Sequence, residues 1–377
     1  MITPETRARD FPALAEMIYL NTAAESIPPL CVGDALQAYW WDKLQGMKGR
    51  DAHYARFHEC REAAARLLQL SAAEVSFCSC SAEAYNLLAT ALKLESQDQI
   101  VISNLDFPSG TTPWLAPRTT SSVRLWKARD GQLAIEDLIP LLNERTRLAQ
   151  VSLVSFYNGH RLDWQPFVEA VRTHAPRAII TVDVTQAFGR VVLDCAEADC
   201  LISSTHKWIL GIHGGCVVAI PQRRSSELTT QAGGWFHLLN AFESDRFERA
   251  ISKAGAASFS VGMPNFAAIY ALNAALCYIA SIGTDKIAAY ADPLVAMLYG
   301  GLIELGLTPM SPWRRDNASG IVSFQHAKSD AIHAALERER INVMHHAGRL
   351  RVSVHGYNTR PEIEMFLKTL GKILLAV

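Results

Sequence analysis

Short apolar runs alternate with longer helical patterns through the first two thirds of the chain. The apolar runs include EVSFCS, QIVISN, AIITVDV, DCLISS and GCVVAI, and the helical patterns include SAEAYNLLATALKL and FVEAVRTHA. This alternation is typical of parallel strands joined by crossover helices that cover both faces of the sheet. We therefore predict an α/β fold with a mostly parallel sheet, whose ligands bind at the carboxyl ends of the strands.

The pattern changes near residue 260, where long helices begin to dominate. A helix is expected between Pro264 and Gly283, which are normal helix punctuation. Strands at GIVSFQH and RLRVSVH and a final helix from Pro361 then predict a smaller α+β unit. We predict a large domain over residues 14–258 and a small C-terminal domain over residues 259–377, with residues 1–13 packing alongside the small domain.

Length and charge favour small-molecule chemistry. A chain of 377 residues with 49% hydrophobic content can bury two cores, and its formal charge of −1 gives no net field to gather nucleic acid or anionic lipid. The N-terminal segment resembles no signal peptide, and we find no run of 18 or more apolar residues. The eight cysteines show no CxxC spacing, so we expect reduced thiols and no metal site. We expect a cytoplasmic protein without a nucleic-acid or membrane partner.

Lys207 is the first candidate for chemistry. It follows the predicted strand DCLISS within the segment SSTHKWILGIHGG, where its neighbours are apolar rather than charged. Most lysines are solvated surface charges, but an amine in this setting can lose its water. Desolvation lowers the pKa of an amine and makes it a nucleophile toward an aldehyde.

Asp183 is the second candidate, because it ends the very apolar strand AIITVDV. A buried carboxylate requires a positive partner, although a strand-end cap is an alternative explanation. Asp183 and Lys207 are 24 residues apart (207 − 183), which is enough for one crossover between neighbouring strands. Pyridoxal phosphate needs this pair: an amine to capture its aldehyde and a carboxylate to keep its ring nitrogen protonated.

Two further segments suit the same cofactor. Ser81 can cap a helix whose free backbone amides at Ser81 and Ala82 would bind a phosphate, although most capped helices bind nothing. Phe107 follows the strand QIVISN, where its ring can stack on a flat cofactor, although core packing is the commoner role of a phenylalanine.

These motifs together resemble the class V aminotransferase family of fold-type I pyridoxal-phosphate enzymes, which includes cysteine desulfurases and isopenicillin-N-epimerase-like proteins. The resemblance extends over nearly the whole chain. Its landmarks are YLNTAAESIPP (residues 19–29), SAEAYNLLATAL, DFPSGTTPW, SLVSFYNGHRLD, VDVTQAFG, STHKW, SVGMPN and RLRVSVHGYNTRPEI. It implies the pyridoxal-phosphate transferase fold, an amino acid substrate and a homodimer.

The resemblance also implies individual roles. Lys207 is the Schiff-base lysine and Asp183 pairs with the ring nitrogen. Gln186 lies near the ring hydroxyl, Ser204 and His206 bind the phosphate with Ser81 and Ala82, and Phe107 stacks on the ring. Arg351 binds the substrate carboxylate, a task suited to a planar guanidinium. Asn21, Tyr157 and His355 are further candidates for the substrate pocket.

Three departures from the family pattern affect the expected reaction. The stretch INVMHHAGRLRVS contains no cysteine where desulfurases carry their nucleophile, so desulfuration by a protein thiolate is not expected. Phe156 replaces a frequent Asn beside the ring hydroxyl, which leaves that edge to Gln186 or Tyr157, and Met263 replaces a threonine that often reaches the partner's phosphate. We expect transamination first, on family frequency. Epimerisation, C–S or C–C bond cleavage, and a non-catalytic role in assembly remain alternatives.

Overall fold

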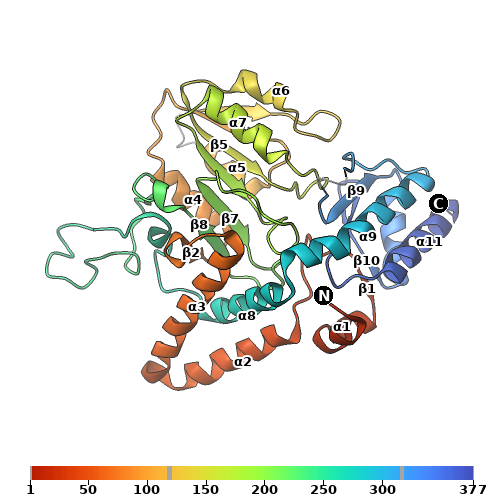
Figure 1. The fold of residues 1–377 in the computed structure, drawn as a ribbon, viewed down its shortest axis with the longest axis horizontal. Coiled ribbons are helices and arrows are strands. Elements are labelled where there is room, and N and C mark those ends of the chain that lie inside the picture. Colours follow the sequence, from red (N-terminus) through yellow and green to blue (C-terminus); the bar gives the residue numbers. More distant parts are fainter. Residues whose placement is uncertain (1, 117–120, 315–317, 377) are drawn as a thin grey trace.

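The computed structural model describes residues 2–116, 121–314 and 318–376. Its centre is a seven-stranded sheet in the order β2-β8-β7-β6-β5-β3-β4, with helices on both faces (Figure 1). β8 runs antiparallel to both of its neighbours, β2 and β7, and the other neighbouring strands of this sheet are parallel to each other. The strands of this sheet are β2 (Val75–Cys78), β3 (Gln99–Ser103), β4 (Ser122–Trp126), β5 (Thr146–Ser152), β6 (Ile179–Asp183), β7 (Cys200–Ser204) and β8 (Cys216–Ala219). The predicted α/β fold is confirmed.

The central strands are mostly apolar because helices cover them on both sides. Every residue of β2, β3, β6, β7 and β8 is buried. The covering helices and the N-terminal helix are α1 (Pro4–Asp10), α2 (Leu30–Leu44), α3 (Arg50–Leu68), α4 (Ser81–Ala91), α5 (Pro108–Leu115), α6 (Ile135–Leu138), α7 (Trp164–His174) and α8 (Phe266–Ile282). Residues 232–252 extend from this body as an arm (Figure 1).

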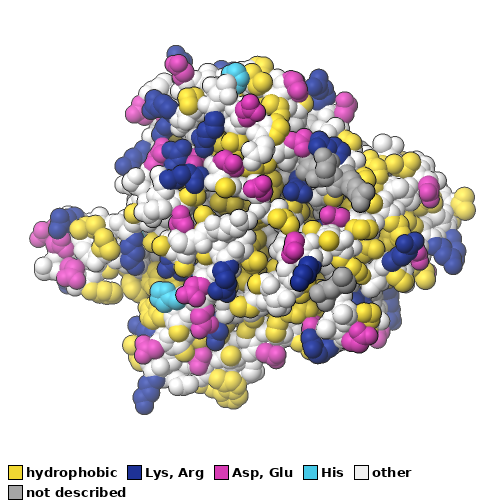
Figure 2. All heavy atoms as spheres, viewed as in Figure 1, with side chains coloured by type: hydrophobic (Ala, Val, Ile, Leu, Met, Phe, Trp, Pro, Cys, Tyr) yellow, Lys and Arg dark blue, Asp and Glu magenta, His cyan; other side chains and the backbone are white. Residues whose placement is uncertain are grey.

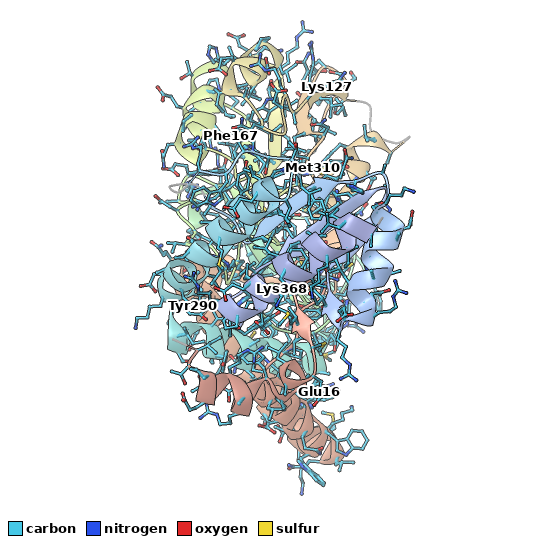
Figure 3. The ribbon with its side chains drawn as sticks, turned by 90° about the vertical axis from the view of Figure 1, so that its right-hand side faces the viewer. Glu16, Lys127, Phe167, Tyr290, Met310 and Lys368 are labelled. Atoms are coloured by element: carbon cyan, nitrogen blue, oxygen red, sulfur yellow. The ribbon has the colours of Figure 1, made fainter. Side chains whose placement is uncertain are left out.

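The C-terminal part forms a smaller α+β unit around its own apolar cluster. A three-stranded antiparallel sheet has the order β11-β12-β9, and a short parallel pair joins β1 to β10. Its elements are β1 (Ile18–Tyr19), α9 (Thr284–Glu304), β9 (Ile321–Gln325), α10 (Ser329–Arg338), β10 (Ile341–Asn342), β11 (Met344–His346), β12 (Arg349–Ser353) and α11 (Arg360–Ala376). Figure 3 shows α9 and α11 side by side, with Tyr290 and Lys368 labelled on them.

The change of core lies further along the chain than the expected boundary at residue 259. Helix α8 packs against α2 and α3, and its Phe266, Ile269 and Leu276 belong to the apolar cluster of the large body. The C-terminal cluster begins with α9, directly after Gly283. Gly283 has a φ of +94°, a conformation in which a residue with a side chain would be strained. Residues 2–13 pack between the two units, because Phe11 contacts Tyr278 of α8 as well as Tyr357.

Helix α9 is long and apolar enough to span a membrane if only length and composition are considered. Its buried residues, among them Leu294, Leu298 and Leu302, pack in the C-terminal cluster, and a core helix meets the same criterion. On the face in Figure 2, basic and acidic side chains are interspersed, as the near-zero net charge suggests.

Candidate active site

A cavity opens where β5, β6 and β7 end, at the edge of the sheet where ligands of parallel sheets bind. Seven of the residues expected from the sequence line it: Ser81, Phe107, Asp183, Gln186, Ser204, His206 and Lys207. The parallel pairing of β6 with β7 brings this about, since Asp183 pairs with Ile202 and the chain reaches Lys207 just after β7.

The Lys207 amine is poised as a nucleophile. Burial and the nearby Arg351 cation lower its pKa to about 8, against the opposing effect of Asp183 and Glu25. Its Nζ lies 5.3 Å from the centre of the Phe107 ring. Within the part of the chain that the structure describes, no hydrogen bond or ion pair engages this amine. The lowered pKa increases the neutral fraction of this amine, and the neutral form is the one that captures an aldehyde.

Asp183 is held in one orientation by two donors. Its Oδ2 accepts a hydrogen bond from the Tyr85 hydroxyl at 2.9 Å, and its Oδ1 accepts one from the Thr185 amide at 2.8 Å. The residue is 7% exposed. A fixed, buried carboxylate at the floor of the cavity can hold a protonated ring nitrogen.

The start of α4 lies at one end of the cavity, but Cys80 rather than Ser81 is its N-cap, and Ser81 is the first helical residue. The amides of the first turn of a helix lack intrahelical partners and attract anions. Ser204 and His206 line the same cavity. Burial, Lys207 and His213 lower the pKa of His206 to about 4, so the ring is neutral near pH 7 and can donate only one hydrogen bond.

Gln186 and Phe107 both line the cavity. The Gln186 amide accepts from Trp208 Nε1 at 2.6 Å and donates to the Ala23 carbonyl at 3.0 Å, which fixes its side chain beside the cavity. Phe107 is 39% exposed and packs edge-to-face on Phe156, with ring centres 4.9 Å apart. Its exposed face can therefore stack on a flat ring.

Arg351 lies directly behind Phe156. The Arg351 Nη1 donates a hydrogen bond to the backbone carbonyl of Phe156 at 2.7 Å. Burial and neighbouring Arg349 lower the pKa of Arg351 to about 9. Tyr157 packs on the Arg349 guanidinium rather than lining the cavity. Asn21 bridges to Ser353 of β12, and its buried Oδ1 has no hydrogen-bond partner.

The expectation that His355 belongs to the substrate pocket is wrong. His355 is fully buried and stacks between Trp208 and Tyr357. Its Nε2 bonds to the Trp208 carbonyl at 3.0 Å and its Nδ1 accepts from the Gly356 amide, so both ring nitrogens are used. The ring therefore supports the segment that carries Lys207.

Several supporting residues escaped the sequence analysis. Tyr85 lies inside α4 and Thr185 follows Asp183, and nothing in their local patterns singles them out. Asp106 accepts from the Ser103 and Ser152 amides, and burial raises its pKa to about 6. An acid next to a strand end was the available signal for Asp106.

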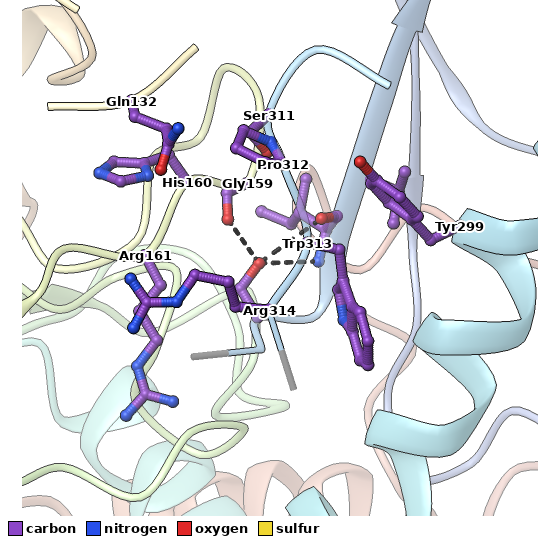
Figure 4. A pocket seen from close by; sticks show the side chains of 12 residues that line it. Gln132, Gly159, His160, Arg161, Tyr299, Ser311, Pro312, Trp313 and Arg314 are labelled. Carbon is purple, nitrogen blue, oxygen red and sulfur yellow. Dashed lines mark hydrogen bonds between the residues drawn. The ribbon is translucent and has the colours of Figure 1, made fainter. Parts of the chain in front are cut away.

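Two other groups of residues have the composition or shape of a binding site. Glu25, His206 and His213 place ligand atoms within 4.8 Å of one another, but His206 belongs to the cavity already described and His213 is exposed. A second pocket lies between His160 and Trp313, and the Ser319 hydroxyl donates to the Gly159 carbonyl beside it (Figure 4). No lysine or carboxylate is among the described residues that line this second pocket.

A nucleophilic amine, a buried carboxylate and a helix start around one cavity, at the carboxyl ends of parallel strands, define a fold-type I pyridoxal-phosphate enzyme. The chain belongs to the class V aminotransferase family, because the family model described as "Aminotransferase class-V" matches residues 18–366. Pyridoxal phosphate is the cofactor of this family, and the unengaged Lys207 amine and the fixed Asp183 carboxylate fit it.

Curated relatives agree with this family. The chain is 28% identical to a cysteine desulfurase of Synechococcus elongatus, over 97% of this chain and 63% of the relative. It is 24% identical to an uncharacterized aminotransferase, YcbU, of Bacillus subtilis, over 98% of this chain and 99% of the relative.

Solved structures share the fold. The apo cysteine desulfurase of Thermococcus onnurineus has a TM-score of 0.88 at 23% identity, over 100% of this chain and 99% of that one. The cystine C–S lyase C-DES, in complex with cysteine persulfide, has a TM-score of 0.87 at 20% identity, over 96% of this chain and 99% of that one. A C-DES variant with glycine covalently linked to its pyridoxal-phosphate cofactor is also similar, with a TM-score of 0.88 at 21% identity, over 97% of this chain and 98% of that one.

Proposed function

We propose that this protein cleaves a C–S bond at the β-carbon of an amino acid, by β-elimination, with pyridoxal phosphate held by Lys207. The observation that carries the proposal is the Lys207 amine, whose pKa is lowered to about 8 and which shares one cavity with Asp183. The names of the relatives support the choice of a C–S bond, since several are called cysteine desulfurases.

Each residue has a defined task in this proposal. Arg351 binds the substrate carboxylate, Asp183 holds the ring nitrogen, and Phe107 stacks on the ring. Ser81, Ala82, Ser204 and His206 bind the phosphate, and Gln186 faces the ring hydroxyl. Bound pyridoxal phosphate supplies a ring that withdraws electrons from the substrate α-carbon.

The bond changes balance without a further reagent. Once the substrate amine has replaced it on the cofactor aldehyde, the freed Lys207 amine would take the proton from the α-carbon. The electron pair of that C–H bond would form a double bond to the β-carbon, and the C–S electron pair would leave with sulfur as a thiolate. Water then converts the released enamine into a 2-oxo acid and ammonia. Lys207 returns its proton to the departing products.

The sequence departs from desulfurases where the protein thiol is expected, which favours elimination over transfer of sulfur to the enzyme. The last cysteine of the chain is Cys277, so β10, β11 and β12 carry none. The two histidines in this region lie outside the cavity: His345 bonds to Ser329 Oγ at 3.1 Å, and His346 is exposed.

Transamination is the second candidate, and it was the first expectation from the sequence. The similarity to YcbU, which is named an aminotransferase, favours it. The two reactions share removal of the α-proton by Lys207 and differ in where the electrons go next.

An amino-acid scan with product analysis separates these reactions. We expect equal amounts of 2-oxo acid, ammonia and sulfur product from an S-substituted cysteine, and no product from the Lys207→Ala variant. A 2-oxo acid that forms only with a keto-acid acceptor, without ammonia, would show transamination. Exchange of the α-proton for deuterium with inversion would show epimerisation. No change in the cofactor absorbance with any amino acid would leave a binding role in assembly.

We further propose that the protein is a cytoplasmic homodimer. The arm exposes Phe242 (81%) and Phe247 (89%), and α2 exposes Trp41 (60%), which are apolar side chains that a second copy would cover. Light scattering after size-exclusion chromatography tests this: a mass near 83 kDa (2 × 41.5 kDa) is expected, and a mass near 41.5 kDa would contradict it.

A further inference from the structure

A second buried arginine accompanies Arg351 on β12. Arg349 and Arg351 are two residues apart on one strand, so their side chains leave the same face of the sheet. Leu350 and Val352 point the other way, into the C-terminal core. Arg349 is 2% exposed and Arg351 is 3% exposed. A strand therefore presents two guanidinium groups, nearly without water, toward the side where the cavity lies.

The Arg349 guanidinium is packed by rings but is short of acceptors. Its centre lies 4.0 Å from the Tyr157 ring centre and 6.0 Å from that of Phe156. Rings cover the faces of a guanidinium and leave its N–H edges free to donate. Both Nε and Nη1 of Arg349 are buried without a hydrogen-bond partner, and so is Nε of Arg351.

Among residues 2–116, 121–314 and 318–376, no carboxylate lies within 4.0 Å of either guanidinium. Burial lowers the pKa of Arg349 against the opposing effect of the Tyr157 hydroxyl, and burial and Arg349 lower the pKa of Arg351. Two adjacent buried cations are costly unless an anion joins them.

One substrate carboxylate satisfies only one of the two arginines. In the proposed function the α-carboxylate belongs to Arg351, which is close enough to Lys207 to lower the pKa of that amine. The free N–H groups of Arg349 then remain without an acceptor. Both arginines lie behind Phe156, whose ring packs edge-on against Phe107 rather than in the apolar core. Movement of this ring would connect the arginines with the cavity.

We propose that Arg349 binds a second anionic group of the substrate, so that the preferred substrate is an α-amino acid whose side chain carries an acidic group. This inference rests on the proposed function, since it assumes an amino acid bound through Arg351. Adjacent strand positions on one face are about 6.6 Å apart, a separation that a short dicarboxylic amino acid can bridge through flexible arginine side chains. Arg349 is thus a specificity-determining residue that contacts the substrate.

The test compares matched acids and amides on the holoenzyme. The dissociation constants of L-aspartate, L-asparagine, L-glutamate and L-glutamine are measured by titrating the cofactor absorbance and by calorimetry. We expect the better acid to bind about 10- to 100-fold more tightly than its amide, because a charge-assisted hydrogen bond is lost in the amide.

Variants assign the preference to Arg349. Arg349→Gln should bring the acid-to-amide ratio close to one by weakening the acid alone, and Arg349→Lys should retain part of it. Arg338→Gln, on the exposed end of α10, is the matched control and should leave the ratio unchanged. The ratio within one variant is independent of how much protein folds.

The outcomes separate this inference from the proposed function. If amino acids change the cofactor absorbance but acids and amides bind equally in the natural protein, the acidic-substrate inference fails and the proposed function stands. An acid preference that survives in Arg349→Gln also refutes it. If no amino acid changes the absorbance while Lys207 holds the cofactor, the proposed function itself fails.

Discussion

Replacing Arg351 with methionine removes a cation that lowers the pKa of Lys207. The lowering from the ordinary value of 10.5 to about 8 corresponds to about 3 kcal/mol against the charged amine. At pH 7.5 about a quarter of the Lys207 amine is then neutral, compared with about one part in a thousand for an ordinary lysine. Burial is the larger cause and Arg351 the second, so Arg351→Met should return part of this energy.

The rate at which the apo-protein captures pyridoxal phosphate reports this pKa, because only the neutral amine attacks the aldehyde. In the natural protein the rate should rise with pH and level off above about pH 8. In Arg351→Met the midpoint should lie about 0.5 to 1 pH higher, with a rate at pH 7.5 about 3- to 10-fold lower. Stopped-flow absorbance of the bound cofactor gives the rate at each pH.

Two controls make the result interpretable. Arg338→Met removes an exposed cation and should leave the midpoint unchanged. Borohydride reduction followed by peptide mapping should tag Lys207 in both variants and leave exposed Lys127 untagged. A midpoint in Arg351→Met that equals or falls below that of the natural protein would refute the electrostatic coupling between the two side chains.

Three further predictions follow from other contacts. Asp183→Asn should still let borohydride tag Lys207 but should slow exchange of the substrate α-proton at least 100-fold, measured by NMR in deuterated water; a loss under 10-fold would contradict its role. Phe107→Ala should weaken cofactor binding about 5- to 10-fold in a fluorescence titration, because one stacked ring is worth about 1 kcal/mol, and unchanged affinity would argue against stacking. Burial lowers the pKa of His160 to about 4 and that of His355 to about 3, so at these two sites the unfolded chain binds more protons below pH 6.5, which lowers the free energy of unfolding. Asp106, whose pKa burial raises to about 6, acts in the opposite direction, so the test compares two proteins that share it. Between pH 6.5 and pH 5.5 the natural protein should lose about 1 kcal/mol more than His355→Gln in urea unfolding, and an equal slope in both proteins would contradict this.

Sequence pattern was sufficient for the fold because the central strands are rich in apolar residues and alternate with helical patterns. Runs such as AIITVDV became β6, and the strand ends carried the polar residues that matter. The boundary at residue 259 was less accurate, because the apolar helix α8 looks the same in sequence whichever core it joins. Its packing against α2 and α3 is a long-range contact that no local pattern encodes.

The sequence predicted those site residues that combine a reactive side chain with a position at the end of a predicted strand. Lys207 and Asp183 stand next to strand ends, so alternation and residue type together identified them. His355 was misplaced because a histidine on the same segment as Arg351 can point to either side of the chain, and only packing shows that Trp208 and Tyr357 enclose it. Tyr85 escaped for the converse reason, since it looks like an ordinary helix residue until β6 brings Asp183 beside it.

The missing thiol and the additional arginine have a common consequence for the reaction. Without a cysteine near β11, nothing in that segment attacks the departing group, so the group must leave carrying its own negative charge. A buried guanidinium stabilises such charge as it develops, more strongly than water does in a site with a low dielectric constant. Arg349, with two unpaired N–H groups, can provide this stabilisation to a side chain that is already anionic. If Arg349→Gln lowers kcat for an acidic substrate by a larger factor than it raises KM, the arginine stabilises the departing group; a change confined to KM limits it to binding.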